Sequence, residues 1–324
     1  MSLVIAMAAH GGADVLQARD IAVPPPGPGE ARIVQAAAGV NFVDIYHRSG
    51  LYPVPGLPAV PGVEGAGVVE AVGPGVEALR PGDRVAYAGL PIGGYAEVRN
   101  LPASRLLALP AGIAVSTAAA AMLRGLTAHM LLHRVVKVGP GSTLLVHAAA
   151  GGLGLLLTQW AKRLGARVIG TVGSEEKAAL ALAHGLDHAI LHREQDFVAE
   201  TRRLTDGRGV DVAYDGIGGD TLKRTLDAVA PFGTVASVGQ AGGPIPAFEV
   251  TELGPRRCLA LARPSVFAYA ADLPSYRAAA GALFAAIADG LRITVGAEFP
   301  LAQAADAQRA LEAGRTTGSI LLRP

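Results

Sequence analysis

A glycine-rich turn between an apolar strand and an amphipathic helix is the feature that most constrains the fold of this chain. Residues 143–148 form a short apolar run typical of a buried strand, and Ala149-Ala150-Gly151-Gly152-Leu153-Gly154 follows directly. After the turn, apolar residues recur at spacings of three and four and predict one helical face that packs on a sheet: Leu153, Leu156, Leu157, Trp160, Ala161 and Leu164. Strand, glycine turn and helix in this order predict the first βα unit of a doubly wound parallel sheet.

The turn has the residue types that a pyrophosphate site needs. A pyrophosphate is bound by backbone N–H groups at a helix N-terminus, so the turn must lack bulky side chains, and its last glycine lets helix and strand approach closely. The candidate dinucleotide contacts are Ala149, Ala150, Gly151, Gly152 and Leu153, with Gly154 at the close approach. A flexible turn without a ligand is the alternative, but it does not explain why strand, turn and helix follow one another in this order.

Strands and helices continue to alternate after this unit. Strand-like runs are expected at residues 167–172, 187–191, 210–214 and 233–238, with helices at 175–184 and 197–205. Five parallel strands with crossover helices predict a dinucleotide site at the carboxyl ends of the strands.

The end of the second strand indicates which dinucleotide binds. NAD-specific enzymes place a carboxylate about 20 residues beyond the glycine turn, where it holds the adenosine ribose hydroxyls. Gly173 occupies that region here, and Ser174 and Lys177 follow it and can donate to a 2′-phosphate, so NADPH is predicted over NADH. Alternatively, Ser174 only caps the next helix and Lys177 is a solvated surface residue. Glu175 and Glu176 favour this alternative, because they complement the helix dipole and oppose a phosphate.

Composition and charge exclude several classes of partner. The 324 residues have a formal net charge of +1, and the basic residues are scattered along the chain. Because they form no basic patch, neither a nucleic-acid nor a membrane partner is predicted. Apolar runs end well before the ~20 residues of a membrane span, and no secretory signal precedes them, so a cytoplasmic protein is expected. Cys258 is the only cysteine, which excludes disulfides within the chain and thiolate zinc clusters, and we expect it to be a buried or half-buried thiol.

The first third of the chain has a different pattern. Short β-rich runs at residues 31–34, 67–72 and 84–87 alternate with turns rich in proline and glycine, as in a β-barrel-like domain. An alanine-rich helix begins near Ser116, before the α/β region. The tail contains a long helix near residues 276–289 and ends in the strand-like segment 319–322, which could join either domain.

Several motifs, taken together, resemble those of one family. They are Leu145, Ala149 to Gly154, Gln159 and Lys162, with Pro28-Gly29-Glu30, Asn41-Phe42-Val43-Asp44-Ile45-Tyr46, Pro61-Gly62-Val63-Glu64-Gly65-Ala66-Gly67, Pro81-Gly82-Asp83-Arg84-Val85 and Gly125-Leu126-Thr127-Ala128. In this order they resemble the quinone oxidoreductases, the zeta-crystallin-like, zinc-free branch of the medium-chain dehydrogenases and reductases. The resemblance implies a GroES-like catalytic domain at residues 1–124 and 263–324, a Rossmann NADPH-binding domain at residues 125–262, and a homodimer or homotetramer joined through the cofactor domain.

The resemblance also bears on metals. Zinc-dependent alcohol dehydrogenases of the wider superfamily carry cysteine and histidine ligands where this chain has Asp44, Val63 and no cysteine. Asp44 and Glu64 alone do not supply the three protein ligands of a catalytic zinc, so no metal site is expected. The resemblance therefore implies direct hydride transfer from NADPH, for which a quinone is an electrophilic acceptor that needs little further activation.

Residues around the reacting groups are implied by the same resemblance. Asn41, Tyr46 and Thr127 are expected around the nicotinamide, Tyr46 and Tyr52 are expected to line the acceptor pocket, and Arg263 is expected at its edge. Tyr52 could equally be a loop tyrosine that packs on prolines, and Asn41 could satisfy backbone groups in a turn.

Further cofactor contacts implied by the resemblance are His192, Gly239 and Gln240. Related reductases commonly have a tyrosine where His192 stands, so stacking of the adenine on a phenol becomes stacking on imidazole or is lost. In the tail segment 314–318 the basic residue Arg315 is also shifted by one position from the usual order. Either change could weaken NADPH binding.

Two other functions stay open at this point. The same architecture reduces the C=C bond of enals, enones or enoyl thioesters, in which case a proton donor must serve the α-carbon and Tyr46 would take that role. Zeta-crystallin-like proteins also include lens structural proteins and RNA-binding proteins, although the lack of a basic patch argues against RNA here.

Overall fold

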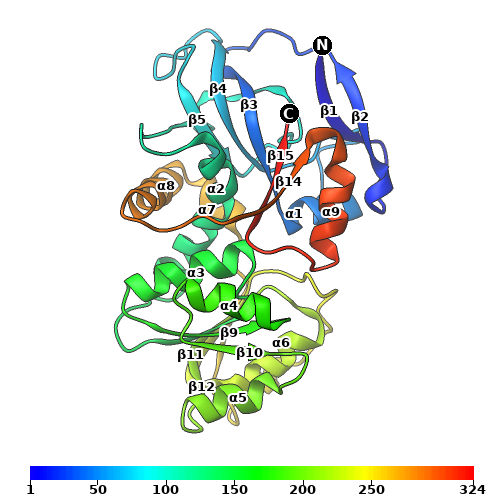
Figure 1. The fold of residues 1–324 in the computed structure, drawn as a ribbon. Helices are drawn as coiled ribbons and strands as arrows, with labels where there is room; N and C mark the ends of the chain where they lie inside the picture. Colours follow the sequence, from blue (N-terminus) through cyan, green and yellow to red (C-terminus); the bar gives the residue numbers. More distant parts are fainter. The chain divides into compact units, whose positions relative to one another are not determined.

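The structure is a computed structural model that describes residues 1–324. The chain divides into two compact units (Figure 1), one of residues 1–126 with 266–324 and one of residues 127–265. The first unit therefore combines the β-rich N-terminal third with the tail, and the second contains the α/β segment.

A six-stranded parallel sheet forms the centre of the second unit. Its strand order is β10-β9-β8-β11-β12-β13, so the chain steps outward from β8 to β10 and then crosses back to β11. The strands are β8 (Thr143–Val146), β9 (Arg167–Val172), β10 (His188–Leu191), β11 (Val210–Asp215), β12 (Val229–Ser237) and β13 (Ala260–Ala262). This order is that of dinucleotide-binding folds, and it confirms the predicted doubly wound sheet.

Four helices connect the strands of the second unit (Figure 1). They are α3 (Gly152–Arg163), α4 (Glu175–Ala183), α5 (Phe197–Leu204) and α6 (Gly219–Thr225). Ser174 and Asp196 accept backbone N–H bonds at the starts of α4 and α5, which is why those helices begin there. Short helical turns lie at Leu226–Ala228 and Val250–Leu253, and a π-helical segment lies at Met130–Val135.

Three expectations for this unit need correction. The sheet has a sixth strand, β13, which was not predicted. It is only three residues long, and two of them are alanines, which have low strand propensity. Strand β12 begins at Val229 rather than at Gly233, and includes Phe232, which has a φ of 66°. Helix α3 is buried from Gly154 to Ala161, far beyond the single apolar face expected from the spacing.

Cys258 is exposed, so the expectation of a buried or half-buried thiol was wrong. The residue lies just before β13 with a φ of 53°, in the left-handed region. Its C=O accepts a hydrogen bond from the Phe232 N–H at 2.7 Å, so the backbone is held in the fold while the thiol faces solvent.

The first unit contains a seven-stranded sheet with the order β14-β15-β3-β4-β5-β7, in which β6 also pairs with β3. Its strands are β3 (Glu30–Val40), β4 (Glu64–Val72), β5 (Arg84–Ala88), β6 (Val98–Pro102), β7 (Leu107–Ala108), β14 (Val295–Pro300) and β15 (Ser319–Arg323). Strand β15 pairs antiparallel with β3, with Ile320 opposite Val40, so the tail joins the first unit (Figure 1). A separate antiparallel pair consists of β1 (Ser2–Met7) and β2 (Leu16–Ile21).

Helices and a shared core complete the first unit. The helices are α1 (Phe42–Ser49), α2 (Val115–His129, which continues into the second unit), α7 (Val266–Ala271), α8 (Leu273–Ala288) and α9 (Ala304–Glu312), with short turns at Ala13–Val15, Ala103–Arg105 and Leu301–Gln303. One core cluster joins Met7, Val40, Tyr95, Ala307 and Ile320, which come from distant parts of the sequence. Burial of such apolar side chains is the main stabilising term for a domain of this kind.

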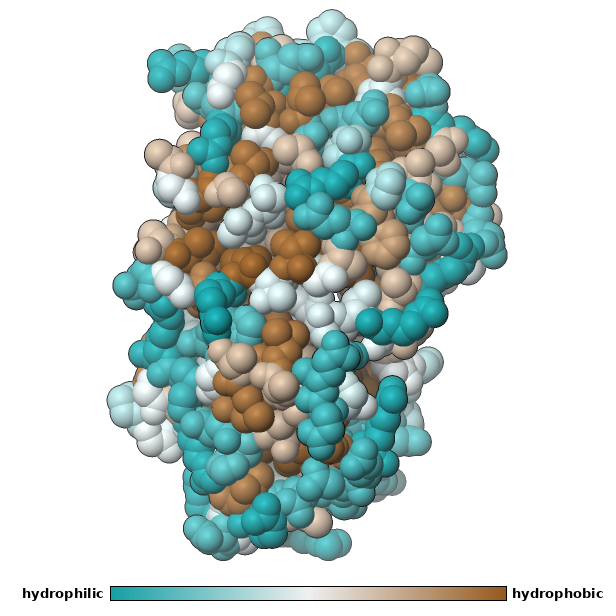
Figure 2. Space-filling view, viewed as in Figure 1, coloured by the Kyte–Doolittle hydropathy of each residue, from teal (hydrophilic) through white to brown (hydrophobic).

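One helical stretch, Val115–Val135, is long and apolar enough by length and composition to cross a membrane. However, 72% of the apolar part of this stretch is buried inside the protein, and a buried core helix has the same length and composition. On the face of the molecule in Figure 2, hydrophobic and hydrophilic side chains are interspersed in both units.

Candidate functional site

The glycine turn predicted from the sequence lies at the carboxyl end of β8. Ala148 has a φ of 52°, and the Gly151 N–H donates to the Ala148 C=O at 2.9 Å and closes the turn. Gly151 is the N-cap of α3, whose first turn contains no acidic residue, so nothing opposes the positive end of the helix dipole. The turn thus brings the predicted contacts Ala149, Ala150, Gly151, Gly152 and Leu153 together in the geometry of a backbone anion site.

Gly154 has the close approach that the sequence predicted. A Cβ atom at this position would lie 2.4 Å from the Ala148 carbonyl oxygen and 2.7 Å from the Ala149 Cα. Both neighbours are backbone atoms and cannot move away alone, so only glycine fits at this position. The cradle, by which we mean residues 148–154, is therefore a shape that a dinucleotide pyrophosphate fits.

His147 directly precedes the cradle and links it to neighbouring elements by hydrogen bonds. The sequence reasoning missed this residue. Its Nδ1 lies 3.0 Å from the Thr171 Oγ1 and its Nε2 lies 2.9 Å from the Thr225 Oγ1. The Thr225 hydroxyl hydrogen is directed toward Asp215 or Thr221, so Thr225 accepts from the Nε2–H of His147. Burial lowers the pKa of His147 to about 4, in agreement with a neutral ring that joins β8, β9 and α6.

Basic side chains gather around Gly173, at the carboxyl ends of β9 and β10. A Cβ atom at Gly173 would lie 3.5 Å from the His192 Nε2 and 3.6 Å from the Arg193 Nε. Burial lowers the pKa of Lys177, and the nearby Arg193 lowers it further. Burial lowers the pKa of His192 too, and Arg193 and Lys177 add to the shift. The three side chains, Lys177, His192 and Arg193, are called the basic cluster below.

Part of the alternative interpretation for this region is also present. The Ser174 Oγ accepts a hydrogen bond from the Lys177 N–H at 3.3 Å and so caps α4. The cap uses the backbone N–H of Lys177 and not its side chain, so the two roles are compatible. Arg193 was not predicted, because it lies after the third strand and only strand pairing brings it to Gly173.

The predicted contacts Gly239 and Gln240 lie where two loops meet beyond β11 and β12. A Cβ atom at Gly239 would lie 2.8 Å from the Gly216 carbonyl oxygen, so the loops touch through their backbones. Arg263 belongs to the second unit, and its guanidinium donates to the Ser237 Oγ at 2.7 Å and to the Gly239 C=O at 3.2 Å. The structure thus brings Arg263 and Gly239 together at the carboxyl end of β12.

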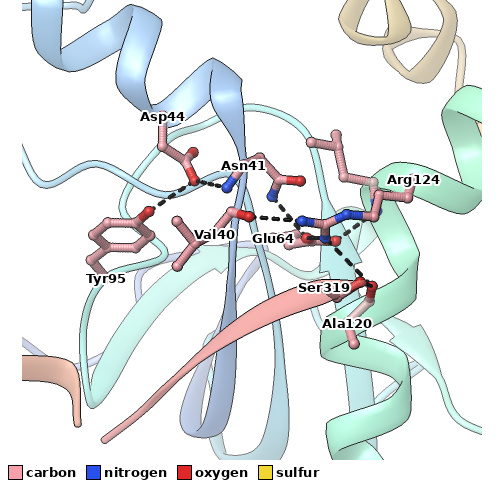
Figure 3. Close-up of polar contacts among 9 residues, drawn as sticks. Val40, Asn41, Asp44, Glu64, Tyr95, Ala120, Arg124 and Ser319 are labelled. Carbon is pink, nitrogen blue, oxygen red and sulfur yellow. Dashed lines mark hydrogen bonds and ion pairs between the residues drawn. The ribbon is translucent and has the colours of Figure 1, made fainter. Parts of the chain in front are cut away.

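A buried polar network surrounds Asn41 in the first unit (Figure 3). The Glu64 carboxylate accepts from the Asn41 Nδ2 at 2.7 Å, from the Arg124 Nη1 at 2.9 Å and from the Leu123 N–H at 2.7 Å. Burial raises the pKa of Glu64, and the guanidinium of Arg124 offsets part of that rise. Because all these partners are donors, the site is built for the ionised carboxylate.

Asp44 lies on the other side of Asn41. Its Oδ2 accepts from the Asn41 N–H at 2.8 Å and from the Tyr95 hydroxyl at 2.9 Å, while its Oδ1 is buried with no hydrogen-bond partner. Burial raises the pKa of Asp44 to about 7, and the nearby Glu64 adds to the effect. Asn41 therefore starts α1 in a capping box with Asp44, which supports the turn role that the sequence left open.

Aromatic rings cluster next to this network. The Tyr46 and Tyr52 rings lie 5.2 Å apart between centroids, and Tyr46 also lies 6.3 Å from Phe42. The His47 ring lies edge-on to Tyr52, with 6.2 Å between the ring centroids. It also stacks on Phe267 of α7, with 6.1 Å between the centroids. The structure thus brings Asn41, Tyr46 and Tyr52 together in the first unit, whereas Thr127 begins the second unit within α2. Tyr46 is buried and Tyr52 is half-buried, and rings of this kind can pack against an aromatic acceptor.

Two family models match the chain. One described as an alcohol dehydrogenase GroES-like domain covers residues 27–111, and one described as a zinc-binding dehydrogenase covers residues 152–272. A quinone oxidoreductase of Pseudomonas aeruginosa is 46% identical over 325 residues, with 100% of each chain covered. The chain belongs to the quinone oxidoreductase family. This confirms the resemblance drawn from the motifs.

Solved structures of the quinone oxidoreductase family share the fold. One from Pseudomonas syringae has a TM-score of 0.97 at 44% identity and covers 100% of both chains. Another, from Escherichia coli and described as complexed with NADPH, has a TM-score of 0.96 at 40% identity and covers 99% of this chain and 100% of its own. A 2-haloacrylate reductase of a Burkholderia species is 42% identical, with 99% of each chain covered.

Asp44 and Glu64, the two carboxylates considered above as zinc ligands, are both hydrogen-bonded within the Asn41 network. Asp44 and Glu64 each accept hydrogen bonds from donors of the chain itself. No group of three or more His, Cys, Asp and Glu side chains has an arrangement that could hold a metal ion. The sequence reasoning considered Glu64 only as part of a motif and as a carboxylate insufficient for a zinc site, and it did not identify Arg124. The one available signal for Arg124 was a charged residue inside an alanine-rich apolar helix.

Proposed function

We propose that this protein transfers a hydride from NADPH to a quinone without a metal. The observation that carries the proposal is the basic cluster around Gly173, at the position where an NAD-specific site has a carboxylate. Burial and then the nearby Arg193 lower the pKa of Lys177 and of His192, and a 2′-phosphate would offset the repulsion between these groups. The relatives support the acceptor, since several at 41–46% identity are named quinone oxidoreductases.

The second unit binds the cofactor in this proposal, and NADPH, when bound, supplies the hydride from its nicotinamide ring. The backbone N–H groups in the first turn of α3 bind the pyrophosphate, with the α3 dipole in support. Lys177 and Arg193 bind the 2′-phosphate, and His192 covers the adenosine end. Gly239 and Gln240 present backbone at the carboxyl end of β12, and Thr127 contacts the nicotinamide end.

The first unit orients the reacting groups. Asn41 and Tyr46 bind around the nicotinamide, and the rings of Tyr46 and Tyr52 hold the acceptor. Arg263, which Ser237 and Gly239 hold in place, is our candidate for a further acceptor contact. A hydride brings two electrons to the quinone, and the oxygen left negative takes one proton to give the hydroquinone. Position supplies most of the rate enhancement, because the quinone is already electrophilic.

Steady-state turnover tests this function. The purified protein is expected to oxidise NADPH with simple benzoquinones and naphthoquinones, and to prefer NADPH over NADH. Turnover of no quinone in the panel, or equal use of the two coenzymes, would contradict the proposal.

Reduction of activated C=C bonds is the second candidate. It is favoured by the 2-haloacrylate reductase relative, which matches over the whole chain. In that reaction the hydride goes to the β-carbon and the Tyr46 hydroxyl would give a proton to the α-carbon. Adding enones and a haloacrylate to the same panel separates the two functions. Tyr46→Phe should slow C=C reduction far more than quinone reduction.

We further propose a cytoplasmic homodimer or homotetramer joined through the second unit. Strand β13 is an edge strand of the parallel sheet, and edge strands pair with further strands when nothing covers them. Close to it, Phe232 is 89% exposed and Val250 is 80% exposed, which is unusual for large apolar residues. Phe232→Asp is expected to shift the sedimentation coefficient toward the monomer, and an unchanged oligomer would contradict this interface.

A further inference from the structure

Glu64 is a fully buried carboxylate whose hydrogen-bonding atoms all face donors (Figure 3). Its Oε1 is shared by the Asn41 Nδ2 and the Arg124 Nη1, and its Oε2 accepts from the Leu123 N–H. An ionised carboxylate can only accept, so only the NH2 end of the Asn41 amide can face it. The amide oxygen of Asn41 therefore points to the other side, where the capping box gives it the Asp44 N–H as one donor and leaves its second lone pair for another donor.

Arg124 fixes the carboxylate relative to the same short segment of chain. Its Nη1 bonds Glu64, and its Nη2 donates to the Val40 C=O at 2.7 Å, directly before Asn41. The guanidinium is held on α2, where Nη1 also reaches the Ala120 C=O at 3.4 Å. A planar guanidinium with several fixed donors can bind a carboxylate and a carbonyl at once, which an ammonium group does less well.

Gly39 makes room for this arrangement. A Cβ atom at Gly39 would lie 2.1 Å from the Glu64 Oε1, so the carboxylate lies directly against the backbone of β3. Any larger residue would displace the carboxylate from Asn41. Three consecutive residues, Gly39, Val40 and Asn41, are thus each fitted to Glu64 or to its partner Arg124.

We propose that Glu64 and Arg124 are positioning residues for the reaction, which fix the Asn41 amide so that its oxygen is the end offered to the ligand. The ligand group that meets Asn41 is then an N–H or O–H donor, such as a carboxamide NH2 or a ribose hydroxyl of the cofactor. This inference rests on the proposed place of Asn41 beside the nicotinamide. A buried ion pair adds little net stability for its desolvation cost, and its structural value here is in orientation.

A double-mutant cycle tests the inference. Glu64→Leu with Arg124→Met removes both charges together, so no uncompensated charge is left buried and folding is expected. The change should lower kcat with the quinone by about 10- to 100-fold through a misplaced amide. In an Asn41→Ala background, the same pair of changes should have no further effect on kcat. Arg48→Met with Glu312→Leu is the matched control, since it removes another partly buried pair of the first unit.

The outcomes separate this inference from the proposed function. A pair replacement that costs kcat only while Asn41 is present supports the inference, provided that the control double variant and the melting temperatures are normal. Equal losses in both backgrounds, or no loss when Asn41→Ala itself is impaired, overturn it and leave the role of Asn41 intact. If Asn41→Ala has full activity, the place of Asn41 in the site and this inference both fail, while NADPH-dependent quinone turnover by the unchanged protein still measures the function.

Discussion

The Asn41 network and the basic cluster are two polar regions built in opposite ways. In the network, Glu64 and Arg124 are buried and bonded to each other and to the chain. In the basic cluster, His192 and Arg193 follow β10 and Lys177 lies in the first turn of α4, and burial and the nearby Arg193 lower the pKa of Lys177 and of His192. A satisfied buried network holds its side chains in one geometry, whereas neighbouring basic groups favour a bound anion. In the proposed function, the first region therefore orients the reacting groups and the second binds the 2′-phosphate.

The largest effect is expected at the cradle, whose backbone shape completes the anion-binding region. Gly154→Val should weaken NADPH binding by about 100-fold or more, because the new side chain would overlap the backbone of Ala148 and Ala149. Nicotinamide fluorescence measures the dissociation constant, and circular dichroism checks the fold. Gly139→Val is the matched control in the same unit, since a Cβ there meets nothing within 4 Å. Unchanged affinity in a folded Gly154→Val protein would show that the cradle is placed wrongly.

Removing a charge from the basic cluster should selectively weaken the use of NADPH and leave the Asn41 network unchanged. Lys177→Ala or Arg193→Ala should each lower kcat/KM for NADPH by roughly 10- to 100-fold, since a charged hydrogen bond contributes about 1.5–3 kcal/mol. The value for NADH should hardly move. Arg203→Ala is the control, because Arg203 is exposed and pairs with Glu200 on the same unit. Equal losses of kcat/KM with both coenzymes would mean that the basic cluster does not bind the 2′-phosphate.

Gly173→Asp should reverse the coenzyme preference. The new Cβ would have only ordinary contacts with His192 and Arg193, so the side chain fits. Its carboxylate would pair with Arg193, repel the 2′-phosphate and accept from the ribose hydroxyls of NADH. The ratio of kcat/KM values for the two coenzymes measures this. A ratio that still favours NADPH as strongly as in the original protein would contradict it.

Asp44 carries the one buried oxygen of the Asn41 network that has no hydrogen-bond partner, its Oδ1. The stability of the folded protein should therefore depend on pH through this residue. Its pKa is about 7 in the folded protein against 3.8 in the unfolded chain, so the folded state binds one more proton between these values. The free energy of unfolding must then fall as pH rises from about 4 to about 7, by up to roughly 4 kcal/mol for this group. Asp44→Asn removes the titration, so its stability relative to the original protein should improve from pH 5 to pH 8. Urea unfolding at both pH values measures the difference, and a pH-independent difference would refute the assignment.

The smallest effect is expected from metal removal. Asp44 and Glu64 accept from donors of the chain and have no third ligand near them, so a chelator should leave quinone turnover unchanged. Loss of turnover with chelator, restored by zinc, would contradict a metal-free site.

The sequence alone determined the parallel sheet, the cradle and the family. These depend on local patterns, because an apolar strand, a glycine turn and an amphipathic helix each follow from neighbouring residues. Even here the short edge strand β13 escaped, since two alanines and a leucine carry too little strand preference. The exposed position of Cys258 escaped as well, because its exposure depends on the left-handed turn that the backbone makes there.

Only the tertiary structure decided which charges meet. Arg193 reaches Gly173 because β10 pairs with β9, and Glu64, Arg124 and Asn41 meet because β4, α2 and the end of β3 pack together. Such pairs join residues that are far apart in sequence, so no local spacing or propensity reports them. The protonation of Asp44 has the same origin, since its cause is burial, and burial is a property of the packed core rather than of the carboxyl group.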